Sequence, residues 1–334
     1  MASNKFAIDF DSAYTNIYKL GSGLVLSEPT VAAVEDNASC KIKAMGKDAY
    51  KLIGKTAKDT KIVFPVFDGE IVNERVAAEL LLAFLQKVGY GSKLLGCSAI
   101  FGVPSGSSPE MLAKYKRVAG AIGIGKVYFA EKPILSALGQ RIALTDSSAR
   151  FVIDMRGGTT SVAAVSLSGV ISGVSINFGS NKISADVIDY VAERFGVQIG
   201  LQSAEKIKKE IGSLDEGDGL SAIISGRNLK TGEVKTLNVK SCDISTPIKN
   251  YYDTIIDIAQ NVIKKLPPEA ASEVRRSGIY ISGIGASAYG LEKYFSDKMG
   301  LKVIVAEDAM YSVALGGGLA IDDKEVLKKI CIEY

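Results

Sequence analysis

Apolar and polar residues form one pattern twice along this chain. Residues 6–20 read FAIDFDSAYTNIYKL and residues 151–165 read FVIDMRGGTTSVAAV, so that Phe6 corresponds to Phe151 without a gap. In both segments an apolar run ends in an aspartate, a turn of small residues follows, and a second β-rich run comes after it. This order predicts two strand–turn–strand hairpins. We interpret the repeat as a duplicated domain, with two unrelated hairpins as the alternative.

The rest of the chain alternates between helical and strand-like patterns, which is typical of an α/β fold. Apolar residues at helical spacing predict helices at 70–88, at 108–123 and, twice, within 184–212. Short apolar runs predict strands at 99–104 and 126–133. We therefore expect sheets covered by helices.

Two glycine-containing turns add to this picture. The β-rich segment 221–241 predicts a hairpin with its turn at Lys230–Gly232, in a small inserted subdomain. The segment GIYISGIGAS at 278–287 predicts a strand and a glycine-rich turn, and a helix follows at 291–300. A single G-x-G is weak evidence, but after two matched hairpins we interpret this turn as part of the same cleft.

The aspartates at the hairpin tips, Asp9 and Asp154, indicate the chemistry of that cleft. Such tips bring backbone N–H groups together, and small residues let a phosphate approach them. A carboxylate repels a phosphate, so we expect each aspartate to hold Mg²⁺ or its waters, with the metal bridging to the phosphates. The hairpins thus predict a nucleotide held between two halves of the chain.

Composition excludes several other functions. The formal charge is +3 over 334 residues, which argues against a nucleic-acid binder. The chain has no histidine, so Ser-His-Asp and Cys-His catalysis and histidine-ligated metals are excluded. The four cysteines lie far apart, which favours reduced thiols in a cytosolic protein. No apolar run has the length of a signal peptide core or a membrane span, so we expect a cytoplasmic protein.

Seven ordered motifs resemble those of the actin-like superfamily and, within it, the MreB family of bacterial cytoskeletal proteins. They cover nearly the whole chain, and together they are more specific than any single glycine motif. The motifs are the first hairpin, GSGLVLSEPTVAAV (21–34), GVPSG (102–106), DMRGGTTSVAAVSLSG (154–169), SAEKIKKEIGS (203–213), SGRNLKTGEVKTLNV (225–239) and the segment 278–318.

This resemblance implies the α/β fold shared by actin, Hsp70 and sugar kinases, with two duplicated domains that each contain a mixed sheet and flanking helices. Domain I would comprise 1–144 and 311–334, with a small subdomain at about 33–75. Domain II would comprise 145–310, with a small subdomain at about 180–245. The resemblance further implies ATP or ADP with Mg²⁺ between the domains, and antiparallel double protofilaments on the inner face of the cell membrane.

The resemblance also implies the residues of the site. Asp9 and Asp154 would organise Mg²⁺ through water, Glu205 and Lys208 would lie at the ribose and base, and Gly283–Ala286 would lie at the adenine. Glu131, Lys132 and Thr159 would occupy the catalytic positions. The residues that would line the nucleotide are Asp9, Asp11, Ser12, Ala13, Tyr14, Asp154, Arg156, Gly157, Gly158, Thr159, Thr160, Glu205, Lys206, Lys208, Gly283, Ile284, Gly285 and Ala286.

The chain departs from the family's pattern at the phosphates. It has Asp11 and Arg156 where the family has glycine, at equivalent positions of the two hairpins. We expect them to face each other, either as an ion pair or with Arg156 on a phosphate and Asp11 in the metal shell; two independent substitutions are the alternative. Ile284 replaces the middle glycine of the adenine loop and is expected to shift base preference.

A further departure affects catalysis. The family's Glu-Glu-Pro reads Glu131-Lys132-Pro133 here, and the second glutamate of that motif positions the attacking water. A charged lysine cannot accept a proton, and losing such a group costs roughly 10²–10⁴ in rate. We therefore predict that ATP binds and that hydrolysis is weak at most, and that Lys132→Glu accelerates it. In the alternative, Lys132 stabilises the γ-phosphate electrostatically.

The resemblance implies self-association, contact with the inner membrane and, for a chain with altered catalytic positions, co-assembly with paralogous actin-like subunits that govern cell shape or motility. Leu94 and Leu95 lie where the family inserts an apolar loop into the membrane. Burying both is worth roughly 3–6 kcal/mol at most, which a filament multiplies; alternatively they lie in the domain core.

Sugar kinases and Hsp70-type chaperones share this fold and are the rival functions. A kinase needs a substrate-positioned carboxylate base, and a chaperone needs a substrate domain after the nucleotide domain. We expect a filament protein instead, because only one helix is predicted after residue 310.

Overall fold

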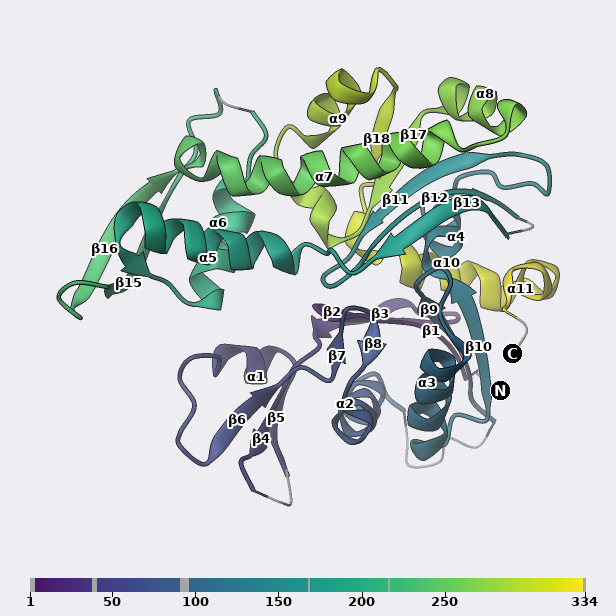
Figure 1. Ribbon diagram of the computed structural model, residues 1–334. Coiled ribbons are helices and arrows are strands. Elements are labelled where there is room, and N and C mark those ends of the chain that lie inside the picture. The colour runs from purple at the N-terminus through teal and green to yellow at the C-terminus, as the bar shows by residue number, and fades with distance from the viewer. Residues whose placement is uncertain (1–3, 38–40, 91–95, 168, 216, 333–334) are drawn as a thin grey trace.

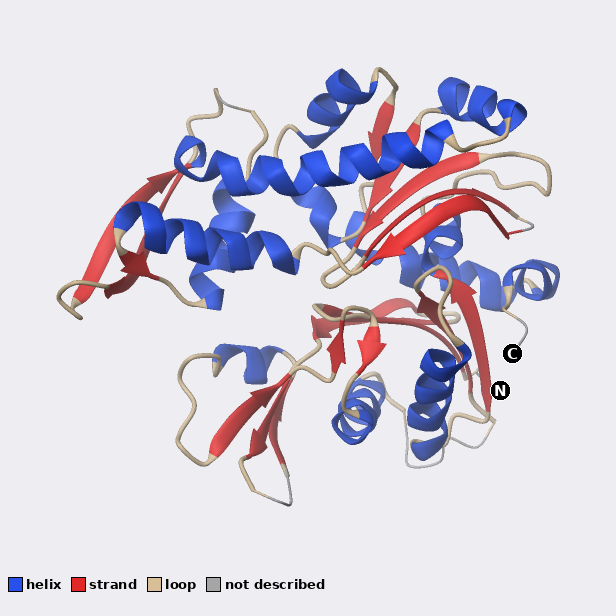
Figure 2. Ribbon diagram, in the orientation of Figure 1, coloured by secondary structure: helices blue, strands red, loops and turns tan. Residues whose placement is uncertain are grey.

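The computed structural model describes residues 4–37, 41–90, 96–167, 169–215 and 217–332. In Figure 1 the purple and blue first half of the chain lies below the teal and green second half, and the yellow C-terminal helices α10 (Ser312–Asp322) and α11 (Lys324–Ile330) lie between them at the right. Each half contains one five-stranded sheet with helices around it (Figure 2).

The first sheet has the strand order β10-β9-β1-β2-β3. β1 pairs antiparallel with β2 and parallel with β9, so the sheet is mixed. Its strands are β1 (Lys5–Phe10), β2 (Tyr14–Lys19), β3 (Gly23–Pro29), β9 (Ser98–Val103) and β10 (Lys126–Glu131).

The second sheet repeats this topology, with the order β13-β12-β11-β17-β18. β11 pairs antiparallel with β12 and parallel with β17, as β1 does with its neighbours. Its strands are β11 (Arg150–Met155), β12 (Thr160–Ser166), β13 (Gly169–Ile176), β17 (Ile279–Ser282) and β18 (Val303–Val305).

The two predicted hairpins keep their sequence offset in the strand register. Ile8 lies opposite Ile17 in the first hairpin, and the corresponding Ile153 lies opposite Val162 in the second. Both hairpins, and the common topology of the two sheets, confirm the duplicated α/β architecture that the pattern predicts.

Smaller sheets extend each half. The first half carries the sheet β5-β4-β6 and the ribbon β7-β8, and the second carries β14-β15-β16, whose hairpin confirms the predicted turn near Gly232. The strands are β4 (Ala32–Glu35), β5 (Ile42–Met45), β6 (Thr60–Val63), β7 (Val66–Phe67), β8 (Glu70–Ile71), β14 (Val197–Gln198), β15 (Ser221–Asn228) and β16 (Val234–Lys240).

The helices predicted at 70–88, at 108–123, within 184–212 and at 291–300 correspond to α2, α3, α5, α6 and α9. Asn73 caps the first turn of α2 by accepting the N–H of Val76, and Ser108 does the same for α3. The helices are α1 (Lys47–Lys51), α2 (Glu74–Lys87), α3 (Pro109–Ala121), α4 (Lys132–Gly139), α5 (Asn181–Phe195), α6 (Leu201–Ile211), α7 (Ser245–Lys264), α8 (Pro268–Ser277), α9 (Leu291–Met299), α10 (Ser312–Asp322), α11 (Lys324–Ile330) and the 3₁₀ turns η1 (Ser241–Ile244), η2 (Ile284–Ser287) and η3 (Ala309–Tyr311).

Helices α4 and α10 lie between the two sheets. Val313 and Ile321 of α10 pack with Ala7 of the first sheet and Val152 of the second in one core cluster. The two helices touch backbone to backbone, because a Cβ on Gly316 would collide with the carbonyl oxygen of Leu135. This layer fixes the distance between the sheets and carries Lys132 into the space between them.

We propose that the domains follow these sheets: domain I from 1–144 with 311–334, and domain II from 145–310. The packing of α10 on β1 supports returning the C-terminal segment to the first domain. Three cysteines, Cys97, Cys242 and Cys331, are free thiols.

Candidate functional site

Asp9 and Asp154 lie near the ends of two strands that are buried on both faces. Burial excludes water from both carboxylates, and each side chain is 0% exposed. A buried carboxylate is costly unless it is paired and hydrogen-bonded. The partners of these two aspartates therefore decide what the site can do.

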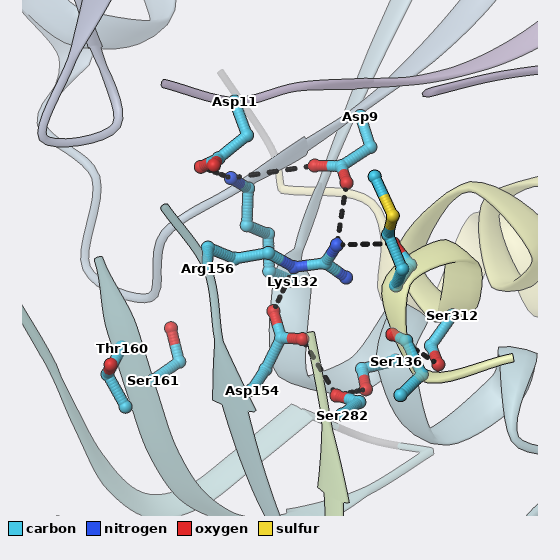
Figure 3. Close-up of polar contacts among 12 residues, drawn as sticks. Asp9, Asp11, Lys132, Ser136, Asp154, Arg156, Thr160, Ser161, Ser282 and Ser312 are labelled. Carbon is cyan, nitrogen blue, oxygen red and sulfur yellow. Dashed lines mark hydrogen bonds and ion pairs between the residues drawn. The ribbon is translucent and has the colours of Figure 1, made fainter. Parts of the chain in front are cut away.

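Arg156 joins the two aspartates across the halves (Figure 3). Its Nε donates to Asp154 Oδ2 at 2.9 Å, and its Nη1 donates to Asp9 Oδ2, also at 2.9 Å. Nη1 donates as well to the carbonyl oxygen of Met310 at 2.9 Å. The guanidinium thus lies between the two carboxylates that the sequence assigned to magnesium.

Lys132 supplies a second buried cation at the start of α4. Its Nζ lies 3.1 Å from Asp11 Oδ1 and 3.6 Å from Asp9 Oδ1, and the side chain is 0% exposed. The expected direct pair between Asp11 and Arg156 is wrong: Asp11 pairs with Lys132, while Arg156 pairs with Asp9 and Asp154. Because Asp9 contacts both cations, these ion pairs form one network of five charged residues.

The carboxylate of Asp11 also accepts backbone N–H groups from both hairpins. Its Oδ2 lies 3.0 Å from the nitrogen of Gly157 and 3.4 Å from that of Ala13. These are N–H groups at the turns where phosphates were expected. An internal carboxylate therefore takes the place of an external anion.

Burial and neighbouring charges shift the pKa values of this network in different directions. Burial raises the pKa of Asp9 above its ordinary value. For Asp11 burial acts in the same direction, but the nearby Lys132 and Arg156 outweigh it and lower the pKa. Burial alone would lower the pKa of Lys132, yet Asp11 and Asp9 raise it. Both cations therefore stay charged at neutral pH.

A chain of hydroxyl groups holds the second oxygen of Asp154. Ser282 donates to Asp154 Oδ1 at 2.7 Å and lies 2.5 Å from Ser136, which accepts from Gln140 at 3.1 Å. Sequence reasoning missed these residues and Asn16, whose Nδ2 lies 3.4 Å from Asp9 Oδ2. The available signal was Ser282, a polar residue at the end of the apolar strand predicted within 278–287, which pairs with β11.

The hairpin tips pack directly on each other. A Cβ on Gly157 would collide with Cβ of Ala13 and lie 2.9 Å from the Ala13 nitrogen. A Cβ on Gly158 would lie 2.6 Å from Ser12 Oγ and 2.8 Å from Asp68 Cα. Glycine is required at both positions by this close approach, and little space remains between the tips.

The donor set does not fit a magnesium ion between Asp9 and Asp154. Mg²⁺ requires oxygen ligands in octahedral geometry, whereas these carboxylates bind a guanidinium that would repel a dication. Within the described ranges, no three Asp, Glu, His or Cys side chains are grouped as a metal site requires. Asp9 Oδ1 lacks a hydrogen bond, but Lys132 Nζ faces it at 3.6 Å.

Two of the predicted catalytic residues do not join this network. Glu131 accepts the N–H of Gly106 at 3.2 Å and so holds the turn of the GVPSG motif. Thr159 Oγ1 is buried without a hydrogen-bond partner among the described residues. Thr160 donates instead to the carbonyl oxygen of Phe178 at 2.6 Å.

The predicted ribose and base residues form a second group. Lys208 pairs with Glu205 at 2.7 Å and donates to Ser184 Oγ at 3.0 Å, and Ser184 also donates to Glu205. Lys206 lies apart from them: it is half exposed and donates to the carbonyl oxygen of Ile223. The predicted ribose and base residues thus include two that contact each other, Glu205 and Lys208, and a third, Lys206, that lies on another face of α6.

A cavity of about 210 Å³ connects the first hairpin with this group. Its walls are mostly apolar, and they bring Tyr14 and Tyr50 of the first half together with Glu205 and Ile284 of the second. Ser12, Ala13 and Lys208 also line it. The cavity therefore lies between the halves, beside the charged network.

Gly283–Ala286, the predicted adenine loop, packs against the second hairpin. Gly283 has φ +89°, and a Cβ on Gly285 would lie 2.8 Å from Cβ of Met155. Tyr252 donates to the carbonyl oxygen of Gly285 at 2.7 Å, which anchors the loop to α7.

Leu94 and Leu95, the predicted membrane contact, lie outside the described residues. Over the described part of the chain, each helix is too short or too polar to cross a bilayer.

Comparison with known proteins identifies relatives along the whole chain. A family model described as MreB/Mbl protein matches residues 3–329. The cell shape-determining protein MreB of Escherichia coli (strain K12) is 32% identical over 332 residues, which cover 96% of this chain and 94% of the relative. The cell shape-determining protein Mbl of Bacillus subtilis (strain 168) is 27% identical, with coverage of 98% and 99%.

Solved structures give the same result. The crystal structure of MreB5 of Spiroplasma citri bound to ADP aligns with a TM-score of 0.90 at 30% identity and covers 98% of both chains. The structure of MreB5 bound to AMPPNP aligns with a TM-score of 0.91, also at 30% identity, and covers 98% of this chain and 97% of the other. The MamK double helical filament, with 17% identity, a TM-score of 0.80 and coverage of 96% and 99%, shares the fold. The actin-like architecture is therefore confirmed, and the chain belongs to the MreB/Mbl family of actin-like, cell shape-determining proteins.

Proposed function

We propose that this chain is an actin-like cytoskeletal subunit that associates with copies of itself into filaments and governs cell shape or motility. The observation that carries the proposal is the family match over residues 3–329. The relation to the MamK double helical filament supports self-association, since this fold forms filaments there. Paralogous actin-like subunits are proposed as co-assembling partners, because the catalytic positions are altered.

The proposed ligand of the cleft is ATP or ADP. MreB5 of Spiroplasma citri has been crystallised with ADP and with AMPPNP at 30% identity to this chain. The cavity between Tyr14, Tyr50 and Glu205 is the proposed nucleotide site, with Gly283–Ala286 beside it. A nucleotide phosphate that approaches the Gly157 N–H must displace the Asp11 carboxylate.

Hydrolysis of ATP is proposed to be weak or absent. Lys132 lies at the position of the family's water-positioning glutamate, and its ammonium group binds Asp11 and Asp9. A lysine held in this way has no lone pair to accept a proton from water. The pairing also argues against the alternative in which Lys132 serves the γ-phosphate, because its donors face the two carboxylates.

Peripheral contact with the inner face of the cell membrane remains part of the proposal, carried by Leu94 and Leu95. We propose to test it by mixing the purified chain with liposomes that contain anionic lipid and comparing it with a Leu94→Ser/Leu95→Ser variant. Equal flotation of both proteins would contradict a role for these leucines.

The first test of function is sedimentation of the purified chain with and without ATP, with released phosphate measured in the same tube. A pellet with little phosphate is the expected result. A chain that stays in the supernatant under all conditions contradicts self-assembly, and phosphate release at the rate of an active relative contradicts weak hydrolysis.

A double variant at Lys132 and Asp11 tests the proposal that ATP hydrolysis is weak. Lys132→Glu alone would place a third carboxylate against Asp9 and Asp11, so the change is combined with Asp11→Gly. This double variant is expected to release phosphate up to about 10²-fold faster than the wild type. Lys329→Glu, on the surface, is the matched control.

A further inference from the structure

The charged network has the composition of an occupied nucleotide site, with every part supplied by the chain itself. In place of a phosphate, the Asp11 carboxylate accepts the N–H groups of Gly157 and Ala13. Backbone N–H groups at such turns bind anions, and a carboxylate has the required negative sign. The donors that a phosphate would need are thus already satisfied.

Two side chains supply the positive charge that a metal would bring. Arg156 lies between Asp9 and Asp154 at 2.9 Å from each, and Lys132 lies against Asp9 and Asp11. Each of these pairs except Lys132–Asp11 involves an aspartate that the sequence assigned to magnesium. Arg156 also connects the halves, because it begins in the second hairpin and reaches Asp9 in the first.

The packing around the network agrees with this interpretation. The turns of the two hairpins meet at Gly157 and Ala13 without room for a side chain, and the Ser105 N–H donates to Ser175 Oγ at 3.0 Å across the halves. Gln202 of α6 donates to the carbonyl oxygen of Tyr50 at 2.7 Å at the far end of the cleft. The halves therefore touch at the tips and on both sides of them.

We propose that Asp11, Lys132 and Arg156 act as an internal replacement for the nucleotide phosphates and their metal ion, and hold the two halves closed without ligand. A closed subunit of this kind needs neither Mg²⁺ nor phosphate to keep its shape. This inference concerns the cleft of the proposed function, but it does not depend on filament formation.

Hydrogen–deuterium exchange of the amides of Ala13 and Gly157 tests the proposal directly. The full-length wild type is measured in EDTA without nucleotide, in Mg²⁺ alone and in Mg-ATP. Exchange is expected to be slow in all three, and to differ by less than about twofold because the closed state is already populated. If both amides exchange freely in EDTA and slow by about 100-fold at ligand concentrations near 100 times Kd, the ligand closes the cleft and the proposal is overturned.

A variant separates the carboxylate from the rest of the fold. Asp11→Ala removes the acceptor of the Gly157 N–H and is expected to accelerate exchange of that amide by about tenfold or more. The amides of Val152 and Ile153, in the middle of β11, report global unfolding and are expected to accelerate less than Gly157, by the loss of global stability alone. Unchanged exchange at Gly157 in this variant contradicts the role of Asp11.

Should Asp11→Ala not fold, the wild-type arms still decide the matter. Thermal unfolding of the wild type offers an independent readout, with Tm expected to be equal in EDTA and in Mg²⁺ with inorganic phosphate. Sedimentation of the same samples keeps the two proposals apart: loss of pelleting with slow exchange at Gly157 would contradict the filament and leave the closed cleft intact.

Discussion

The first and second hairpins share their register and a buried aspartate, and they differ in charge at the second residue after that aspartate. In the first hairpin that residue is Asp11, and in the second it is Arg156. Asp11 and Arg156 do not bind each other. Asp11 binds Lys132 of α4, and Arg156 binds the two aspartates that are equivalent in the repeat, Asp9 and Asp154.

This difference shows how the tips of two duplicated hairpins can come to have different roles. With glycine at both positions, the two tips would present the same N–H groups to one shared anion. With one acid and one base, the first tip supplies an anion and the second tip supplies a cation. Removing one partner of a buried pair leaves an uncompensated charge, so the two halves become energetically dependent on each other.

The strongest way to break this dependence is Arg156→Met. It leaves Asp9 and Asp154 buried without their shared cation, and we expect a loss of about 3–5 kcal/mol in the free energy of unfolding. Urea unfolding followed by circular dichroism measures it. Arg75→Met, in an exposed pair with Glu79, is the control and should cost less than about 1 kcal/mol. Equal costs for both variants would mean that Arg156 is not a structural cation.

Lys132→Met sharpens the comparison on the first hairpin. Asp11 then keeps its two N–H donors but loses its charged partner, and we expect a loss of about 1.5–3 kcal/mol. The double variant Asp11→Asn/Lys132→Met should be more stable than the sum of the single changes predicts, by about 0.5–3 kcal/mol. A double-mutant cycle from urea unfolding measures this coupling. Additive costs would show that the pair has no coupling energy.

Gly157→Ala tests the contact between the tips. The new Cβ would collide with Ala13, so we expect a loss of about 1–3 kcal/mol. Gly120→Ala is the matched control, because no atom lies within 4 Å of its Cβ position on the exposed face of α3. That control should instead stabilise the chain by about 0.5–1 kcal/mol. Thermal unfolding of both variants shows whether the signs differ.

The smallest expected effect concerns pH. The pKa of Asp11 is lower in the folded chain than in the unfolded chain, so its contribution to stability is present above the unfolded value of about 3.8 and is lost as the pH falls below it. Asp9 acts in the opposite direction, since its raised pKa makes its contribution largest at low pH. The stability difference between wild type and Asp11→Asn should therefore shrink as the pH is lowered from 7 toward the acid limit. A constant difference over that range would contradict the pairing of Asp11 with Lys132.

Local patterns predicted the backbone of the site well. The alternation of apolar residues located both hairpins, and the offset between Phe6 and Phe151 predicted their common register. The caps of α2 and α3 also follow local chemistry. Helix α7 was not predicted, although Tyr251, Ile255 and Ala259 repeat on its buried face. An apolar stripe of this kind is a local signal that was overlooked.

Local sequence patterns could not predict which residues the charged side chains of the site bind. Arg156 has three acidic side chains within the same small volume, and which of them it binds depends on where its guanidinium reaches across the halves. Lys132 was placed by its motif, yet the motif does not say that it points at Asp11 instead of solvent. The hydroxyl chain through Ser136 and Ser282 requires α4 and β17 to be adjacent, which only the assembled fold determines.

The backbone contact between α4 and α10 has a consequence for biosynthesis. Residues 312–322 lie on β1, so this strand is synthesised long before the helix that covers it. Until then Ala7 and Ile100 stay open to water, and the early product exposes apolar surface that invites aggregation. The contact between β1 and α10 also forms slowly, because about three hundred residues separate them in the chain. Chaperones are therefore expected to engage the nascent first half and to release it only after α10 has emerged.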